Sequence, residues 1–86
     1  LVSTNFTIHP NPTNGIFFLK FNLEKKQDVL VSITDLSGRN VYKQNLNNML
    51  GNISVDANLN NLSNGAYYVS VITDQSLETK KLIIQR

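Results

Sequence analysis

Apolar and polar side chains alternate with a period of two through most of this 86-residue chain. The alternation is clearest after the turn signal Asn64-Gly65, where aromatic and β-branched residues dominate. Because successive side chains of a strand point to opposite faces, one face of this segment is expected to be buried. The expected core face carries Tyr67, Val69, Val71 and Thr73, and the other face carries Ala66, Tyr68, Ser70 and Ile72. Residues 66–73 are therefore predicted to form the central strand.

The same period marks further segments, and no window of helical length shows a comparable 3.6-residue period. Six more strands are predicted at residues 6–8, 16–23, 28–36, 39–46, 53–55 and 77–86. Residues 24–27 and 45–52 are predicted loops, and residues 56–62 a crossing segment. About seven short strands predict an all-β fold, an antiparallel immunoglobulin-like Greek-key β-sandwich, with a small Greek-key barrel as the alternative.

The alternation also predicts the core. Inward-facing positions are Phe17, Leu19, Phe21, Leu23, Val29, Val31 and Ile33, and Leu59 and Leu62 are expected to close one end. The pattern leaves open whether Met49 and Leu50 lie under the sheet or face the solvent.

Glycine and proline predict the turns. Pro10-Asn11-Pro12, followed by Asn14-Gly15, predicts a rigid, sharply bent connection, because proline fixes φ and glycine readily takes up positive φ. Ser37-Gly38 predicts a tight hairpin. The four glycines, Gly15, Gly38, Gly51 and Gly65, all fall at predicted turns and none within a predicted strand.

Leu62, Gly65 and Tyr67 match a tyrosine corner, in which a tyrosine hydroxyl turns back onto the preceding connection. An ordinary core tyrosine beside a turn is the alternative. Both interpretations give Tyr67 a packing role.

Composition favours a folded, non-catalytic module. The chain is 41% hydrophobic and 16% charged, which is typical of one globular domain. Its net charge is +2, and its basic residues form no stripe with aromatics between them, so nucleic acid is not expected as a partner. No apolar run is long enough to span a bilayer. The chain lacks a starting methionine, and we expect residues 1–5 to end a linker and residues 6–86 to form the domain.

The sequence offers little chemistry. It contains no cysteine and only one histidine, His9, so neither a disulfide framework nor a thiolate or imidazole metal site is expected. The acidic residues lie at or near predicted loops with no motif linking them, and the glycines are isolated from one another. We therefore predict no enzymatic activity, no metal and no cofactor.

Four motifs occur in order along the chain. They are Pro10-Asn11-Pro12 followed by Gly15, then Gly38-Arg39 after a strand, then Gly65-Ala66-Tyr67 opening a late strand, and Lys81 before the closing apolar run. In this order and spacing they resemble the type A C-terminal sorting domain of the type IX secretion system of the Bacteroidetes. The resemblance covers residues 6–86. His9 stands where tyrosine is common in that family, and Ser63-Asn64 replaces a frequent proline-alanine.

This resemblance implies a secretion signal carried as a fold. Family members travel from the periplasm through the outer membrane to the cell surface or the extracellular space, with outer-membrane shuttle or translocon proteins as partners. A sortase-like cysteine peptidase commonly removes the domain at the surface, and a cut near or before residues 1–5 is expected here. A monomer is expected.

The resemblance also suggests which residues work. Partner recognition is expected from Pro10, Asn11, Pro12, Gly38, Arg39, Lys80, Lys81 and Arg86, while Gly15, Gly65 and Tyr67 are expected to maintain the fold. From the residues alone, the basic C-terminal group could equally be a solvated edge that discourages unwanted strand pairing.

A function of another class competes with this one. An immunoglobulin-like adhesion or carbohydrate-binding module that stays on the mature protein usually offers an exposed aromatic platform. Tyr42 and Tyr68 are the candidates for such a platform.

Overall fold

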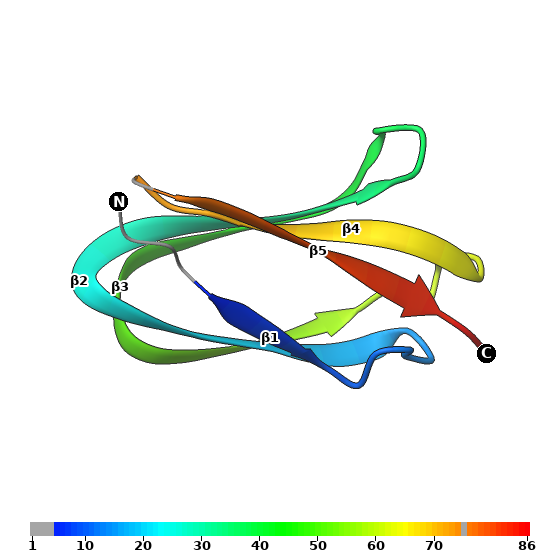
Figure 1. Ribbon diagram of the computed structural model, residues 1–86, viewed down its shortest axis with the longest axis horizontal. Helices are drawn as coiled ribbons and strands as arrows, with labels where there is room; N and C mark the ends of the chain where they lie inside the picture. The colour runs from blue at the N-terminus through cyan, green and yellow to red at the C-terminus, as the bar shows by residue number, and fades with distance from the viewer. Residues whose placement is uncertain (1–4, 75) are drawn as a thin grey trace.

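The computed structural model describes residues 5–74 and 76–86, and every regular element in them is a strand (Figure 1). The strands are β1 (Phe6–His9), β2 (Ile16–Asp35), β3 (Asn40–Asn58), β4 (Gly65–Ile72) and β5 (Leu77–Ile84). All pairings between these strands are antiparallel, which confirms the predicted fold class. Of the predicted linker end, residues 1–4 lie outside the described residues.

The sheet folds over on itself because β2 and β3 form one long hairpin that bends at its middle (Figure 1). Along the edge of β2 opposite β3, β1 pairs with the first half of β2 and β4 with its second half, and β5 continues the sheet beyond β4. Two stacked layers result. The lower layer contains β1, residues 16–23 of β2 and residues 51–58 of β3; the upper layer contains residues 27–35 of β2, residues 40–49 of β3, β4 and β5.

The prediction of about seven strands is wrong, because two pairs of predicted strands are continuous. Residues 24–27 remain extended within β2, and residues 45–52 remain extended within β3, where loops were predicted. The hairpin turns the corner by register shifts and by positive φ angles at Asn48 (55°) and Gly51 (84°). Gly51 therefore lies within a strand and Gly65 is the first residue of β4, whereas no glycine was predicted within a strand. Strand β3 also runs to Asn58, so the crossing between the layers is shorter than predicted.

The core fills the space between the two layers. Its buried apolar side chains are Phe6, Phe17, Leu19, Phe21, Leu23, Val29, Val31, Ile33, Ile53, Val55, Ala57, Leu59, Tyr67, Val69, Val71, Leu82 and Ile84. Every predicted core position of β2 is among them. Leu62 and Thr73 are half-buried. Met49 packs against the core in a half-buried position, whereas Leu50 is 58% exposed, which answers the question that the pattern left open.

Neighbouring phenylalanines of β2 provide a matched test of this core. Phe17 is fully buried and Phe18 is 39% exposed on the other face of the strand. We expect Phe17→Ala to lower the free energy of unfolding by about 3–5 kcal/mol, because it leaves a cavity. Phe18→Ala should cost at most about 1 kcal/mol. Urea unfolding followed by circular dichroism measures both, and equal losses would contradict the assignment of the faces.

Candidate partner-binding surface

The proline-rich segment, residues 10–13, lies along the outer edge of β5. The Asn11 side chain donates from Nδ2 to the carbonyl of Lys81 at 2.9 Å and accepts the N–H of Ile83 at Oδ1 at 3.0 Å. Thr13 continues the contact: its N–H donates to the Ile83 carbonyl at 2.9 Å, and its carbonyl accepts the Gln85 N–H at 2.8 Å. Both prolines follow cis peptide bonds. Asn11 and Thr13 therefore occupy edge groups of β5 that an added strand would need.

Gly15 and Arg86 connect this segment to the crossing between β3 and β4. Gly15 has a φ of 122°, and an added Cβ would lie only 2.8 Å from Nη2 of Arg86. The Arg86 guanidinium donates to the carbonyl of Leu59 at 2.9 Å and to the carbonyl of Leu62. The Gly15 carbonyl accepts the N–H of Leu59 at 2.7 Å. The guanidinium predicted to meet a partner is thus engaged within the domain, and Gly15 suits both the backbone angle and the available space.

Tyr67 forms a tyrosine corner. Its hydroxyl donates to the carbonyl of Ser63 at 2.7 Å, and its ring is buried. Gly65, at the start of the same strand, has a φ of 152°. The hydrogen bond ties the crossing segment to the core of β4, so the first of the two interpretations of Tyr67 is confirmed.

Asp35 organises the hairpin that carries Gly38 and Arg39. One of its carboxylate oxygens accepts the Ser37 hydroxyl at 2.6 Å, the Ser37 N–H at 2.9 Å and the Arg39 N–H at 3.0 Å. The other oxygen lies 3.2 Å from Nε of Arg39. Gly38 has the positive φ, 90°, that the predicted hairpin requires. The hydrogen bond from the Ser37 hydroxyl is the main cause that lowers the pKa of Asp35 from its ordinary value. Sequence reasoning missed Asp35, although an acid two residues before a serine is a known turn signal.

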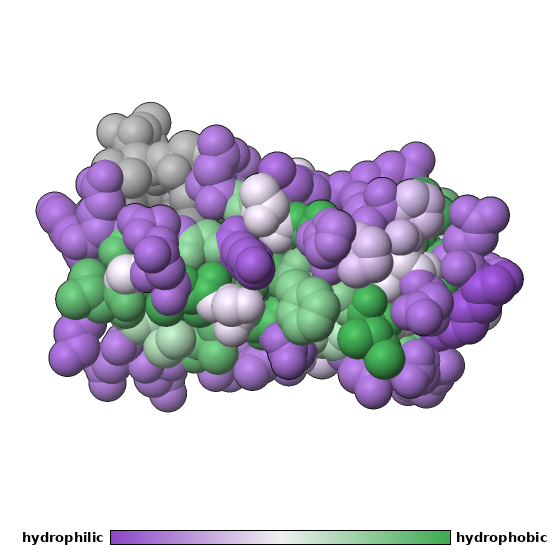
Figure 2. Space-filling view, turned by 90° about the horizontal axis from the view of Figure 1, so that it is seen from below, coloured by the Kyte–Doolittle hydropathy of each residue, from purple (hydrophilic) through white to green (hydrophobic). Residues whose placement is uncertain are grey.

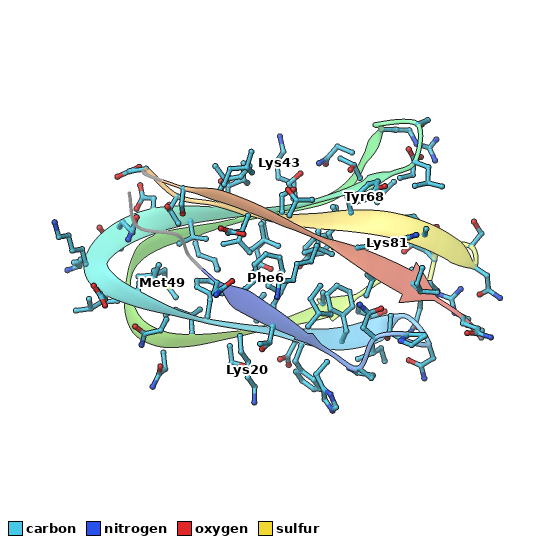
Figure 3. All side chains as sticks on the ribbon, in the orientation of Figure 1. Phe6, Lys20, Lys43, Met49, Tyr68 and Lys81 are labelled. Atoms are coloured by element: carbon cyan, nitrogen blue, oxygen red, sulfur yellow. The ribbon has the colours of Figure 1, made fainter. Side chains whose placement is uncertain are left out.

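Lys80 and Lys81 point to opposite sides of β5. The Lys80 ammonium lies 5.4 Å from the centre of the Phe6 ring and covers the seam between β1 and β5. Lys81 is exposed on the outer face of the upper layer, opposite Tyr68 in the register. Figure 3 labels both Phe6, between the layers, and Tyr68, outside the upper layer.

The structure gathers part of the predicted surface at one end of the sandwich. Residues 10–13, Lys81 and Arg86 surround the C-terminal part of β5, and the hairpin at residues 36–39 extends from the same end (Figure 1). Arg39 lines a hollow of about 430 Å³ whose opposite wall is formed by residues 61–67. Lys80 lies apart, on the seam. Of the two platform candidates, Tyr68 is 41% exposed, whereas Tyr42 is half-buried and donates its hydroxyl to Gln44.

Metal-binding groups and membrane-spanning helices are two features that the described residues do not show. Among residues 5–74 and 76–86, no three histidine, aspartate or glutamate side chains lie close enough together to hold a metal ion. The same residues form no helix long and apolar enough to cross a membrane.

Comparison with known proteins gives the family. The family described as "Secretion system C-terminal sorting domain" matches residues 7–85. The chain belongs to this family. It is therefore a sorting signal for type IX secretion, and membership implies interaction with the secretion machinery and export to the cell surface or the extracellular space.

A structural comparison agrees on the fold of this sorting domain. A DUF3244-family protein from Bacteroides vulgatus with an immunoglobulin-like β-sandwich fold has a TM-score of 0.67 and 17% sequence identity, over 95% of this chain and 94% of that chain. The predicted immunoglobulin-like sandwich is confirmed. Among curated proteins, the comparison finds no match. Family and fold together indicate a non-catalytic module.

The bonds of Asn11 to β5 give a test of the proline-rich segment. Asn11→Ala removes both bonds, so we expect the free energy of unfolding to fall by about 1–2 kcal/mol and the amide of residue 83 to exchange faster. Asn47→Ala, an exposed position on β3, is the control and should cost at most about 0.5 kcal/mol. If both variants unfold alike, residues 10–13 do not secure β5.

The carboxylate of Asp35 gives a pH test. Because its pKa is lowered in the folded state, Asp35 stabilises the domain above the ordinary carboxyl pKa, and this contribution is lost as the pH falls through the lowered value. Thermal unfolding of the wild type and of Asp35→Asn should differ at neutral pH and converge in acid. Ser37→Ala, which removes the main cause of the shift, should weaken the pH dependence. A difference that persists unchanged into acid would contradict this role.

Proposed function

We propose that this sorting domain directs a cargo protein from the periplasm through the outer membrane by presenting its folded surface to an outer-membrane shuttle or translocon protein. The observation that carries the proposal is the family match over residues 7–85, which spans all five strands. Because the match covers the whole fold, the shape of the domain is the natural unit of recognition.

The hydrogen bonds of three motif residues and of Arg86 support this proposal. Asn11, Gly15, Tyr67 and Arg86 hold the proline-rich segment, the crossing and the end of β5 together. Side chains that are engaged in these internal bonds are less available to a partner than their exposed neighbours. Arg39, on the projecting hairpin, and Lys81, on the outer face of β5, are the better candidates for direct contact. Lys80 lies over Phe6, at the seam between β1 and β5.

Removal of the domain is the second part of the proposal. At the cell surface, a sortase-like cysteine peptidase cuts the chain near or before residues 1–5 and separates the cargo from the domain. The first described strand begins at Phe6, so a cut further along the chain would require the paired strand β1 to open before it could enter a protease cleft.

A reporter fusion tests the secretion function. Residues 1–86 are fused to the C-terminus of a reporter exported to the periplasm of a type IX-competent cell. We expect the reporter at the cell surface or in the medium, and we expect it to stay in the periplasm in a strain that lacks the secretion channel. A fusion lacking residues 77–86 should also stay, because Leu82 and Ile84 belong to the core.

Mass spectrometry of the exported reporter shows whether, and at which residue, the domain has been cleaved off. A peptide ending upstream of Phe6 is expected. Export that does not depend on the channel, or equal export without residues 77–86, would contradict the proposal.

A further inference from the structure

Most of the domain's basic residues outside the bend have a partner within the domain or lie on its lower layer. Arg39 pairs with Asp35, Arg86 donates to carbonyls of the crossing, and Lys80 covers Phe6. Lys20 lies on the outer face of the lower layer, which Figure 2 shows from below, and Lys25 and Lys26 lie at the bend. Two cations remain, Lys43 and Lys81, and both are exposed on the outer face of the upper layer.

The strand register shows what separates these two lysines. Lys81 of β5 lies opposite Tyr68 of β4, which lies opposite Thr34 of β2. Lys43 of β3 lies opposite Ser32 of β2. The two lysines are therefore three strand spacings apart across the sheet and two residues apart along the strands, about 16 Å in all, with an exposed tyrosine and small hydroxyl side chains between them. Figure 3 shows Lys43 and Tyr68 on the side of the upper layer that faces away from the core.

We call this surface the basic face. Its members are Lys43, Lys81, Tyr68, Ser32, Thr34, Ser70 and Thr79.

The basic face lacks compensating acids. Among the described residues, the outward positions of these four strands include one carboxylate, Asp28, which lies at the bend and accepts the N–H of Asn48 at 2.9 Å. The salt bridge found in the described part of the chain joins Arg39 to Asp35, outside this face. Lys43 and Lys81 thus present positive charge without an acidic neighbour in their rows, so an acidic surface would complement them.

An apolar row borders the basic face on the side of the bend. Leu30, Ile72 and Leu77 lie opposite one another across three strands, and Leu77 is 65% exposed. Aliphatic side chains next to cations and a tyrosine suit the surface of a protein better than a polysaccharide, which has few apolar groups to cover them. A second copy of the chain is disfavoured, because a symmetric contact would bring lysines against lysines.

We propose that the basic face docks an acidic surface of a protein of the secretion machinery, with carboxylates meeting Lys43 and Lys81 and aliphatic side chains meeting the apolar row. This inference rests on the proposed function and specifies the surface that performs it. It adds Lys43, which no motif marks and which the strand register places on the same face as Tyr68 and Lys81, in the neighbouring row.

Charge variants of the reporter fusion test the inference. Lys43→Glu combined with Lys81→Glu should lower the exported fraction about tenfold or more, and Lys43→Arg combined with Lys81→Arg should export as the wild type does. Lys20→Glu reverses one charge on the opposite face, half the change of the double variant, and should leave export unchanged. Thermal unfolding of the purified domains confirms that each variant is folded.

Photocrosslinking identifies the occupant. A photoreactive phenylalanine analogue at position 68 should give an adduct in secretion-competent cells. The same analogue at position 18 is the control: Phe18 is about as exposed as Tyr68 but lies on the opposite face of the sandwich, so it should give no adduct. An adduct whose extra mass is degraded by protease supports the inference. A ladder of adducts that resists protease would indicate a bound polysaccharide. An adduct with twice the mass of the fusion would indicate a second copy of the chain. Either result would overturn the inference.

The outcomes separate the two proposals. If the wild-type fusion is not exported, the proposed function fails. If the wild type is exported and the double glutamate variant is exported equally, or if Lys20→Glu blocks export as strongly, the inference about the basic face fails while the proposed function stands.

Discussion

The structure depends on one constraint: β2 and β3 are each shared by both layers. Their bent hairpin carries the apolar face of β2 through the lower layer and then through the upper layer, so side chains such as Leu19 and Val31 belong to one core. Loss of either layer would expose the core face of the other, and burial of apolar surface is the main favourable term in folding. A domain of this size has only about 4–13 kcal/mol of stability in total, so neither layer is expected to persist alone.

The remaining features close the ends and edges of this shared core. The tyrosine corner anchors the crossing, Arg86 binds the carbonyls of that crossing, and Asn11 covers the edge of β5. The residues that identify the family therefore act largely within the domain. Lys81 is the exception, because it is a motif residue whose side chain is exposed on the outer face of the upper layer.

The sequence predicted the faces of the strands well, because burial of one face imposes a strict two-residue period. Every predicted core position of β2 is buried, and both the hairpin at Gly38 and the tyrosine corner at Tyr67 are present. The strand count was wrong for a physical reason. Residues 24–26 are charged and exposed at the bend, and Gln27 is polar, so this segment looks like a loop although its backbone stays within a continuous strand. Local composition cannot separate these cases, since the pairing that keeps the bend extended comes from β3.

The sequence suggested candidate site residues only where the resemblance to the family marked them. Pro10, Asn11, Pro12 and Arg86 were expected to contact a partner, yet their neighbourhood shows bonds of Asn11 and Arg86 within the domain. Lys43 belongs to no motif. It lies opposite Ser32 because of the way β2 and β3 pair, which includes several register shifts along the hairpin. The alternation of apolar and polar residues within one strand does not predict how that strand pairs with a distant one.

Native-state hydrogen exchange tests the shared core most directly. If β2 joins both layers into one unit, the amides of Leu19 in the lower layer and Val31 in the upper layer should exchange with the same free energy of opening, equal to that of global unfolding. Exchange of Leu19 at a clearly lower free energy, while Val31 remains protected, would show that the lower layer opens alone and would contradict the account.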